Sequence, residues 1–239
     1  MAVNSFVSAG TPAAVVTDWH SAAQLIDHTL LSPDATRDSV LRLCSEALDF
    51  GFHSVVVNPC HVALAAARLH VTPVKVCTVV GFPLGANLTT TKIAEAEAAL
   101  HNGAHELDMV INIGALKSGD RVLVRNEMHT LAELAHGSAA LLKAIVEIGL
   151  LSQEEKILAC ALAMDAGADF VKTSTGFAAL GATAADVAIM RGVVGHHLGV
   201  KAAGGIRTSA DLREMVDAGA NRIGTSAGLE IVREMGAPG

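Results

Sequence analysis

The stretch "MDAGADFVKTS" (residues 164–174) contains a sequence pattern, or rhythm, that is repeated along the chain. A helix-like pattern ends at a glycine, and an apolar, strand-like run begins within one to three residues. The same rhythm returns in "LDFGFHSVVVN" (48–58), "LHNGAHELDMV" (100–110) and "VDAGANRIGTS" (216–226). Glycine suits these positions because the residue that closes a helix often takes a positive φ, which costs glycine nothing. Each repeat therefore predicts a tight return from a helix to a strand.

Strand-like runs alternate with helical patterns along the chain. They are "LIDHT" (25–29), "SVVVN" (54–58), "VKVCTVV" (74–80), "ELDMVIN" (106–112), "LLKAIVE" (141–147), "DFVKTS" (169–174), "LGVKAA" (198–203) and "NRIGT" (221–225). Eight alternating units are what a (β/α)8 barrel, the TIM barrel, requires. A doubly wound open sheet normally carries a Gly-rich fingerprint after its first strand, and none follows "LIDHT". The pattern predicts an α/β fold built as a single TIM barrel.

Length and composition agree with one such domain. The 239 residues, 51% of them hydrophobic, supply a core, and no linker-like run divides the chain. We therefore expect a flexible leader over 1–18, the barrel over 19–235 and a short tail over 236–239. A formal charge of -7 argues against a nucleic-acid partner, and no apolar run reaches the ~20 residues of a membrane helix. Four scattered cysteines without a C-x-x-C pair indicate reduced thiols in a cytoplasmic protein.

Four charged residues stand out among the apolar neighbours of the predicted strands, namely Asp108, Lys143, Lys172 and Lys201. Side chains alternate between the two faces of a strand, and the outer face of a barrel strand must be apolar to meet the helices. The small and branched neighbours of these residues suit that outer face. The four charged side chains are therefore predicted to point into the barrel, towards the C-terminal mouth where such barrels place their chemistry.

These buried charges allow two interpretations. They can form an ion-pair network in which Asp108 neutralises one lysine. However, three lysines against one or two carboxylates do not balance, and a surplus buried lysine relieves its cost by losing its proton. A neutral lysine is a nucleophile, and a second ammonium group nearby lowers its pKa further. The pattern thus favours a lysine activated to form a Schiff base.

Small residues follow the last two predicted strands. Gly204 and Gly205 come directly after the seventh strand, and Gly224, Thr225 and Ser226 come directly after the eighth. In TIM barrels these two loops commonly bind phosphate through backbone N–H groups. Together with the lysines, they predict carbonyl chemistry on a sugar phosphate. Lys172 would form the imine, and Asp108 and Lys201 would relay protons, because a chain without tyrosine offers no phenolic acid.

A metal-dependent reaction is the alternative to the imine. The chain has 11 histidines, yet it contains no H-E-x-x-H motif. His28, His53 and His105 fall near predicted strands but show no recognisable ligand spacing. We therefore expect neither a metal nor a cofactor.

Several motifs also carry a family resemblance. At "ELDMVINIG", "LLKAIVE", "FVKTSTGF" and "VKAAGGIRT" the chain resembles the deoxyribose-phosphate aldolases, and "LIDHTLL", "VVVNP" and "GFPLGA" look like further landmarks of that family. The resemblance extends from about residue 22 to about residue 230. It implies a metal-free class I aldolase that splits 2-deoxy-D-ribose 5-phosphate into D-glyceraldehyde 3-phosphate and acetaldehyde. It also implies a homodimer or a homotetramer.

The same resemblance assigns roles to individual residues. It makes Lys172 the Schiff-base lysine, Lys201 the partner that tunes its pKa, and Asp108 the proton donor and acceptor. Lys143 is expected to organise the site rather than to react, and Thr173 is expected to contact the substrate through its hydroxyl. Asp27 and Thr29 are expected either to line the substrate pocket or to have a structural role.

Two other functions stay open at this point. The first is another imine-forming barrel aldolase that retains the Lys172 and Lys201 pair but acts on a different phosphorylated sugar. The second is a phosphate-binding barrel that serves as a scaffold or sensor, in which the lysines merely pair with phosphate or carboxylates.

Overall fold

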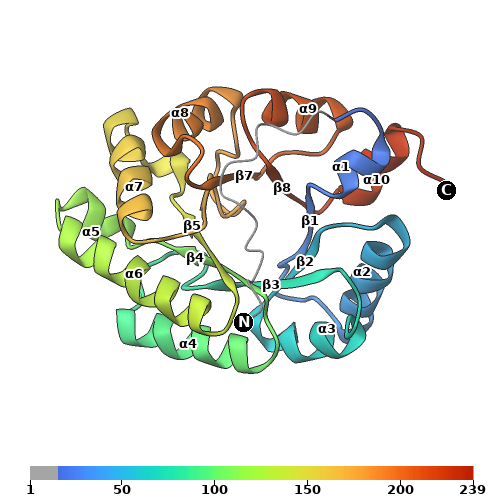
Figure 1. The fold of residues 1–239 in the computed structure, drawn as a ribbon, viewed down its shortest axis with the longest axis horizontal. Coiled ribbons are helices and arrows are strands. Elements are labelled where there is room, and N and C mark those ends of the chain that lie inside the picture. The colour runs from blue at the N-terminus through green and yellow to red at the C-terminus, as the bar shows by residue number, and fades with distance from the viewer. Residues whose placement is uncertain (1–15, 239) are drawn as a thin grey trace, which may run out of the picture.

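Eight parallel strands close into a barrel in chain order in the computed structural model, which describes residues 16–238 (Figure 1). The strands are β1 (Ile26–Leu30), β2 (Ser54–Val57), β3 (Lys75–Val80), β4 (Glu106–Val110), β5 (Leu141–Ile145), β6 (Phe170–Lys172), β7 (Gly199–Ala203) and β8 (Arg222–Thr225). Strand β1 pairs with both β2 and β8, so the sheet closes on itself. The predicted TIM barrel is confirmed, and each predicted strand is present with its ends within two residues of the expected ones.

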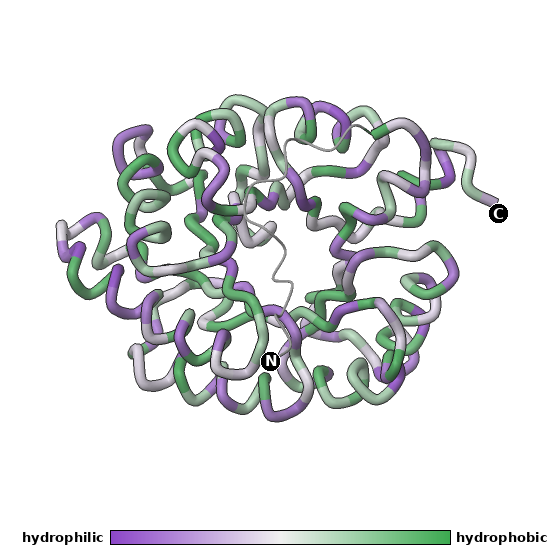
Figure 2. The backbone as a smooth tube through the Cα atoms, viewed as in Figure 1, coloured by the Kyte–Doolittle hydropathy of each residue, from purple (hydrophilic) through white to green (hydrophobic). Residues whose placement is uncertain are grey.

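Helices surround the barrel and cover its outer face (Figure 1). They are α1 (Trp19–Ala23), α2 (Arg37–Phe50), α3 (Val62–Arg68), α4 (Thr89–His101), α5 (Ile113–Lys117), α6 (Arg121–Gly137), α7 (Gln153–Asp165), α8 (Ala184–Val194), α9 (Ser209–Asp217) and α10 (Gly228–Glu234), with 3-10 turns η1 (Pro59–His61) and η2 (Ile148–Leu150). Hydrophobic and hydrophilic residues alternate along most of these helices, as expected for helices with one face on the core (Figure 2). None of the helices between residues 16 and 238 combines the length and apolar character that a membrane crossing requires.

The returns from helix to strand follow the rhythm seen in the sequence. Gly51, Gly103, Gly167 and Gly219 take φ values of 67°, 97°, 80° and 112°. A side chain other than glycine rarely adopts this left-handed region, so glycine lets each helix stop and each strand begin within a few residues.

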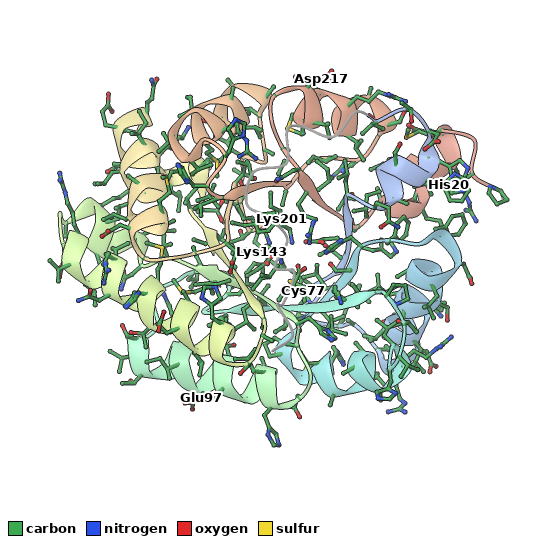
Figure 3. All side chains as sticks on the ribbon, viewed as in Figure 1. His20, Cys77, Glu97, Lys143, Lys201 and Asp217 are labelled. Carbon is green, nitrogen blue, oxygen red and sulfur yellow. The ribbon has the colours of Figure 1, made fainter. Side chains whose placement is uncertain are left out.

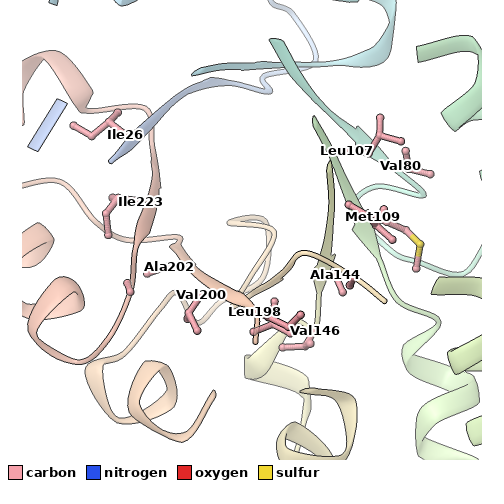
Figure 4. Close-up of a cluster of buried hydrophobic side chains, with 14 of the residues drawn as sticks. Ile26, Val80, Leu107, Met109, Ala144, Val146, Leu198, Val200, Ala202 and Ile223 are labelled. Carbon is pink, nitrogen blue, oxygen red and sulfur yellow. The ribbon is translucent and has the colours of Figure 1, made fainter. Parts of the chain in front are cut away.

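The hydrophobic core lies between the strands and the helices. The outward-facing side chains of neighbouring strands, such as Val171, Val200 and Ala202, are fully buried there. Figure 4 shows part of this cluster, with residues of β1, β4, β7 and β8 contributing. Because the outer face is apolar, the alternate side chains of the same strands point into the barrel. The inward orientation predicted for the charged residues follows from this arrangement.

The predicted leader and tail meet the domain at its two ends. Residues 1–15 of the predicted leader lie outside the described residues. Within the described part, the carbonyl of Val16 accepts a hydrogen bond from Nη1 of Arg213 at 2.6 Å, and Asp18 caps the N-terminus of α1. At the other end, the N–H of Ala237 donates to the carbonyl of Val232 at 3.0 Å.

Candidate active site

Asp108 lies at the centre of a cluster of charged side chains inside the barrel. Its Oδ2 accepts hydrogen bonds from Nζ of Lys172 and Nζ of Lys201, each at 2.8 Å. Its Oδ1 accepts from Nζ of Lys143 at 2.8 Å and from the Cys77 thiol at 3.2 Å. Figure 3 shows Lys143, Lys201 and Cys77 together in the middle of the barrel. The structure thus brings together the four charged residues that the strand pattern singled out.

The cluster extends further than the sequence suggested, through Asp27, Glu106 and Arg222. Nη1 of Arg222 donates to Oδ1 of Asp27 at 2.9 Å and lies 3.0 Å from Oε2 of Glu106. Glu106 also pairs with Lys143 at 2.5 Å, and Asp27 pairs with Lys201. The expectation of one or two carboxylates against three lysines was therefore wrong in its count, because both Asp27 and Glu106 join the cluster. Arg222 was missed, although it interrupts a strand-like run as the lysines do.

The cluster still holds one more basic group than it holds carboxylates. Lys143, Lys172, Lys201 and Arg222 face Asp27, Glu106 and Asp108. All seven side chains are buried, with at most 5% of any of them exposed. A buried charge without a partner is costly, and the cost falls if one basic group is neutral. The charges balance when one lysine has lost its proton.

The electrostatic surroundings select Lys172 as that lysine. Burial lowers its pKa below the ordinary lysine value, Asp108 opposes this effect, and the positive charge of Lys201 lowers the pKa further. Burial also disfavours the charged form of Lys201, but Asp108 and Asp27 together raise its pKa above the ordinary value. The pKa of Lys143 is raised well above the ordinary value, since Asp108 and Glu106 outweigh burial. Lys172 is therefore the one of these three lysines whose neutral form is favoured.

The Asp108 carboxylate remains charged in this setting. Burial alone would raise its pKa, but Lys143, Lys172 and Lys201 together hold the pKa well below the usual range. The pKa of Glu106 is likewise held well below its usual range, because Arg222 and Lys143 outweigh burial. These carboxylates keep Lys143 and Arg222 protonated. Lys172 is then the basic group whose charged form is stabilised least.

A cavity of about 330 Å³ opens at the C-terminal ends of the strands. Its wall comes from the ends of β1, β6, β7 and β8 and the loops that follow them, namely Thr29–Ser32, Lys172, Thr175–Phe177, Ala203–Arg207 and Gly224–Ser226. Of the charged cluster, Lys172 alone contributes to this wall. A carbonyl compound in the cavity can therefore reach the amine of Lys172. Asp108, Lys143 and Lys201 contact or surround this amine from inside the barrel and do not line the cavity.

Most of the predicted binding residues lie on the cavity wall. These are Thr29, Gly204, Gly205, Gly224, Thr225 and Ser226. Gly204 and Gly205 take φ values of 91° and 82°, so the loop after β7 depends on glycine at both positions. The loops after β7 and β8 meet at this wall, as the phosphate-binding prediction requires.

Three predicted binding residues lie elsewhere. Asp27 and Lys143 are fully buried in the charged cluster and are not among the residues that line the cavity, so their roles towards the substrate stay predictions. Thr173 is also fully buried, and its hydroxyl donates to the carbonyl of Ala203 at 3.1 Å and accepts from the N–H of Ala203 at 3.0 Å. These hydrogen bonds join the end of β6 to β7 and occupy the hydroxyl. From sequence, a polar residue that supports the site cannot be distinguished from one that touches a ligand.

The cavity wall also contains residues that the sequence analysis did not select. Thr175, Gly176 and Phe177 follow Lys172 by three to five residues, and Arg207 follows the Gly204–Gly205 pair. Their position directly after a predicted strand was the available signal, because loops that follow strands form the mouth of a TIM barrel. Arg207 is an exposed side chain and adds a positive charge near the two glycines.

One group of possible metal ligands is present among the described residues, and none of its members lines the cavity. Ligand atoms of Asp27, His53 and Glu106 lie within 4.8 Å of one another. However, Nη1 of Arg222 contacts both carboxylates, and Lys143 contacts Glu106. The guanidinium group already supplies the positive charge that these oxygens need, so the donor set fits an ion-pair network better than a metal centre.

This geometry defines a class of protein, namely a TIM-barrel enzyme whose buried lysine can form an imine with a carbonyl compound at the C-terminal mouth. The model of the DeoC/LacD family aldolases matches residues 21–235. The chain therefore belongs to this family of aldolases.

Individual relatives agree with this assignment. The deoxyribose-phosphate aldolase of Halalkalibacterium halodurans is 57% identical over 213 residues, which cover 89% of this chain and 95% of the relative. The deoxyribose-phosphate aldolase of a Geobacillus species is 55% identical over 210 residues, which cover 88% and 94%. Among solved structures, the deoxyribose phosphate aldolase of Aeropyrum pernix, described as a unique tetramer, has a TM-score of 0.86 at 36% identity and covers 91% of this chain and 92% of its own.

Proposed function

We propose that this chain is a deoxyribose-phosphate aldolase, which reversibly cleaves 2-deoxy-D-ribose 5-phosphate to D-glyceraldehyde 3-phosphate and acetaldehyde through a Schiff base on Lys172. One observation carries the proposal. Lys172 has a lowered pKa and lies on the cavity wall. The other two lysines of the charged cluster have raised pKa values and do not line the cavity. The names of the relatives described above, which are deoxyribose-phosphate aldolases, indicate the substrate.

The first half of the reaction forms the imine. The neutral amine of Lys172 attacks the aldehyde carbon C1 of the sugar, and the resulting carbinolamine loses water to give a protonated imine. The positive charge of this imine lies beside Oδ2 of Asp108, which holds Nζ of Lys172 at 2.8 Å before the reaction. Asp108 therefore stabilises the charge that appears on the nitrogen.

The second half breaks the carbon–carbon bond. A base removes the proton of the C3 hydroxyl, C3 becomes the aldehyde carbon of D-glyceraldehyde 3-phosphate, and the electrons of the C2–C3 bond pass into the imine to give an enamine. Protonation of C2 and hydrolysis then release acetaldehyde and restore the amine. Oδ2 of Asp108 accepts a hydrogen bond from Nζ of Lys201 at 2.8 Å, so these two groups form a short path for the protons beside Lys172.

The phosphate end of the substrate is assigned to the loops after β7 and β8. Gly204, Gly205 and Ser226 place backbone groups on the cavity wall without bulky side chains between them and a ligand. Arg207 adds a positive charge to the same part of the wall. This arrangement supports a phosphorylated sugar as the substrate class.

An aldolase that uses the same lysine for a different phosphorylated sugar is the second candidate. A product assay separates the two, because only cleavage of 2-deoxy-D-ribose 5-phosphate releases acetaldehyde together with D-glyceraldehyde 3-phosphate.

We also propose that the protein works in the cytoplasm as a homodimer or a homotetramer. Light scattering on the purified protein would measure the number of subunits.

Borohydride reduction in the presence of acetaldehyde tests the function. The wild-type protein should gain one two-carbon adduct, and peptide mass mapping should place it on Lys172. Lys172→Leu should gain none, whereas the matched control Lys75→Leu, which removes an exposed lysine of β3, should react as wild type. An adduct on another residue, or no adduct on the wild-type protein, would contradict the proposal.

A further inference from the structure

Glu147 stands out among the residues that no step of the proposed reaction uses. It follows β5 and has a φ of 55°, in the left-handed region that residues other than glycine rarely adopt. Only 2% of its surface is exposed, and the salt bridges among residues 16–238 do not include it. A strained backbone and a buried carboxylate without a cation are both costly, and such costs concentrate where a site requires them.

The carboxylate of Glu147 holds the loop that follows Lys172. Its Oε2 accepts from the hydroxyl of Thr175 at 2.5 Å and from the N–H of Thr175 at 3.2 Å. Oγ1 of Thr175 in turn accepts from the N–H of Phe177 at 3.1 Å. Thr175, Gly176 and Phe177 all line the cavity. Glu147 itself does not, so it acts on the cavity through this chain of hydrogen bonds.

Two further contacts fix the same loop. The N–H of Ala182 donates to the carbonyl of Gly204 at 2.9 Å, and a Cβ on Gly181 would lie 2.2 Å from that carbonyl oxygen. The loop after β6 therefore packs directly on the loop after β7, with no side chain between them. The ring of Phe177 meets the ring of Phe82 edge to face, with their centroids 5.2 Å apart. Among the residues that make these contacts to the loop, Glu147 is the ionisable one.

The segment 175–177 lies beside the proposed phosphate loops. A Cβ on Gly176 would be 3.9 Å from Cα of Gly204, so the two glycines face each other across a small gap. The N–H of Gly176 donates to no acceptor among the described residues, which leaves it available to an anion. The amine of Lys172, in contrast, is held by Asp108 and forms no salt bridge with Glu147. A displacement of this segment would therefore alter the phosphate end of the site more than the imine end.

We infer that Glu147 is a positioning residue, which fixes the segment 175–177 so that the cavity binds the phosphate monoester end of the substrate. This inference rests on the proposed aldolase function. It assigns Glu147 to binding of the phosphorylated substrate and leaves imine formation with acetaldehyde to the charged cluster inside the barrel.

The test compares two substrates and two variants. Glu147→Ala removes the oxygen that accepts both hydrogen bonds from Thr175. The KM for 2-deoxy-D-ribose 5-phosphate should then rise about tenfold or more, which is the usual effect of losing hydrogen bonds to a charged group. The KM for unphosphorylated 2-deoxyribose and the rate of adduct formation between acetaldehyde and Lys172 should stay as in wild type. Glu147→Gln keeps an acceptor oxygen and should restore most of the affinity. Glu97→Ala on α4, which removes an exposed carboxylate, is the matched control and should change nothing (Figure 3).

Thr175→Val provides a second route if Glu147→Ala does not fold, because it removes the hydroxyl and preserves the shape of the side chain. It should produce the same selective rise in KM. Equal losses on both substrates, or no change on either, would overturn the inference. A wild-type protein that cleaves neither substrate would instead contradict the proposed function, and this inference with it.

Discussion

Lys201→Leu is the substitution that most sharply tests the electrostatic basis of the site. The positive charge of Lys201 lowers the pKa of Lys172, after burial, which has the largest effect. Leucine removes this charge and fills much of the same volume. Asp27 keeps its hydrogen bonds from Arg222 at 2.9 Å and from Ser54 at 2.6 Å, so we expect the cluster to remain folded.

The size of the effect follows from the geometry. Because both amine nitrogens lie 2.8 Å from the same oxygen, their repulsion acts over about 5 Å, and Coulomb's law with an effective dielectric constant of about 20 gives about 3 kcal/mol. A change of about 3 kcal/mol corresponds to about a hundredfold smaller fraction of neutral amine at a pH below the pKa. The loss of Lys201 also leaves Oδ2 of Asp108 entirely to Lys172, which acts in the same direction.

The assay is the rate of imine formation with acetaldehyde, trapped by borohydride and measured against pH. In Lys201→Leu the acidic limb of this profile should move to higher pH by about two pH units. Lys201→Arg retains the positive charge and should leave the limb close to its wild-type position. A lost proton relay would lower the rate equally at every pH, so the position of the limb separates the two effects. An unchanged limb in Lys201→Leu would refute the reasoning.

Three further predictions address the nucleophile, the phosphate site and the buried charges. Lys172→Leu should abolish turnover and leave the free energy of unfolding unchanged or higher, because an apolar side chain replaces a buried amine, and chemical denaturation would measure this. Arg207→Met should raise the KM for the phosphorylated sugar about tenfold and leave the KM for 2-deoxyribose unchanged in steady-state assays, since only the phosphate pairs with the guanidinium group. The pKa values of Glu106 and Asp108 are lowered by folding, so both stabilise the native state above the unfolded pKa of about 4, and this contribution is lost as the pH falls below that value. Denaturant midpoints that stay constant between about pH 6 and pH 3 would contradict this last prediction.

The barrel was predictable because local signals agreed with one another along the chain. Glycines such as Gly167 and Gly219 mark the ends of helices, and each is followed at once by an apolar strand. The alternation of side chains along those strands then placed Asp108, Lys172 and Lys201 inside. These inferences need only short-range spacing and the requirement that the outer face of the barrel be apolar.

The composition of the charged cluster was harder to predict, because it depends on which side chains meet across the barrel. Asp27 on β1 reaches Lys201 on β7, although 174 residues separate them in sequence. Such a contact depends on the stagger of the strands, which no single strand encodes. For the same reason, the role of Glu147 towards Thr175 depends on a backbone φ and a loop conformation that the sequence pattern does not reveal.

A direct titration of the Lys172 amine in the wild-type protein tests the central claim. Nitrogen-15 NMR of labelled lysine side chains can follow each Nζ with pH, and Lys172→Leu identifies the signal. We predict that Lys172 titrates below the ordinary lysine pKa of ~10.4, while Lys201 titrates above it. A Lys172 amine that stays protonated up to the ordinary lysine pKa would contradict the account.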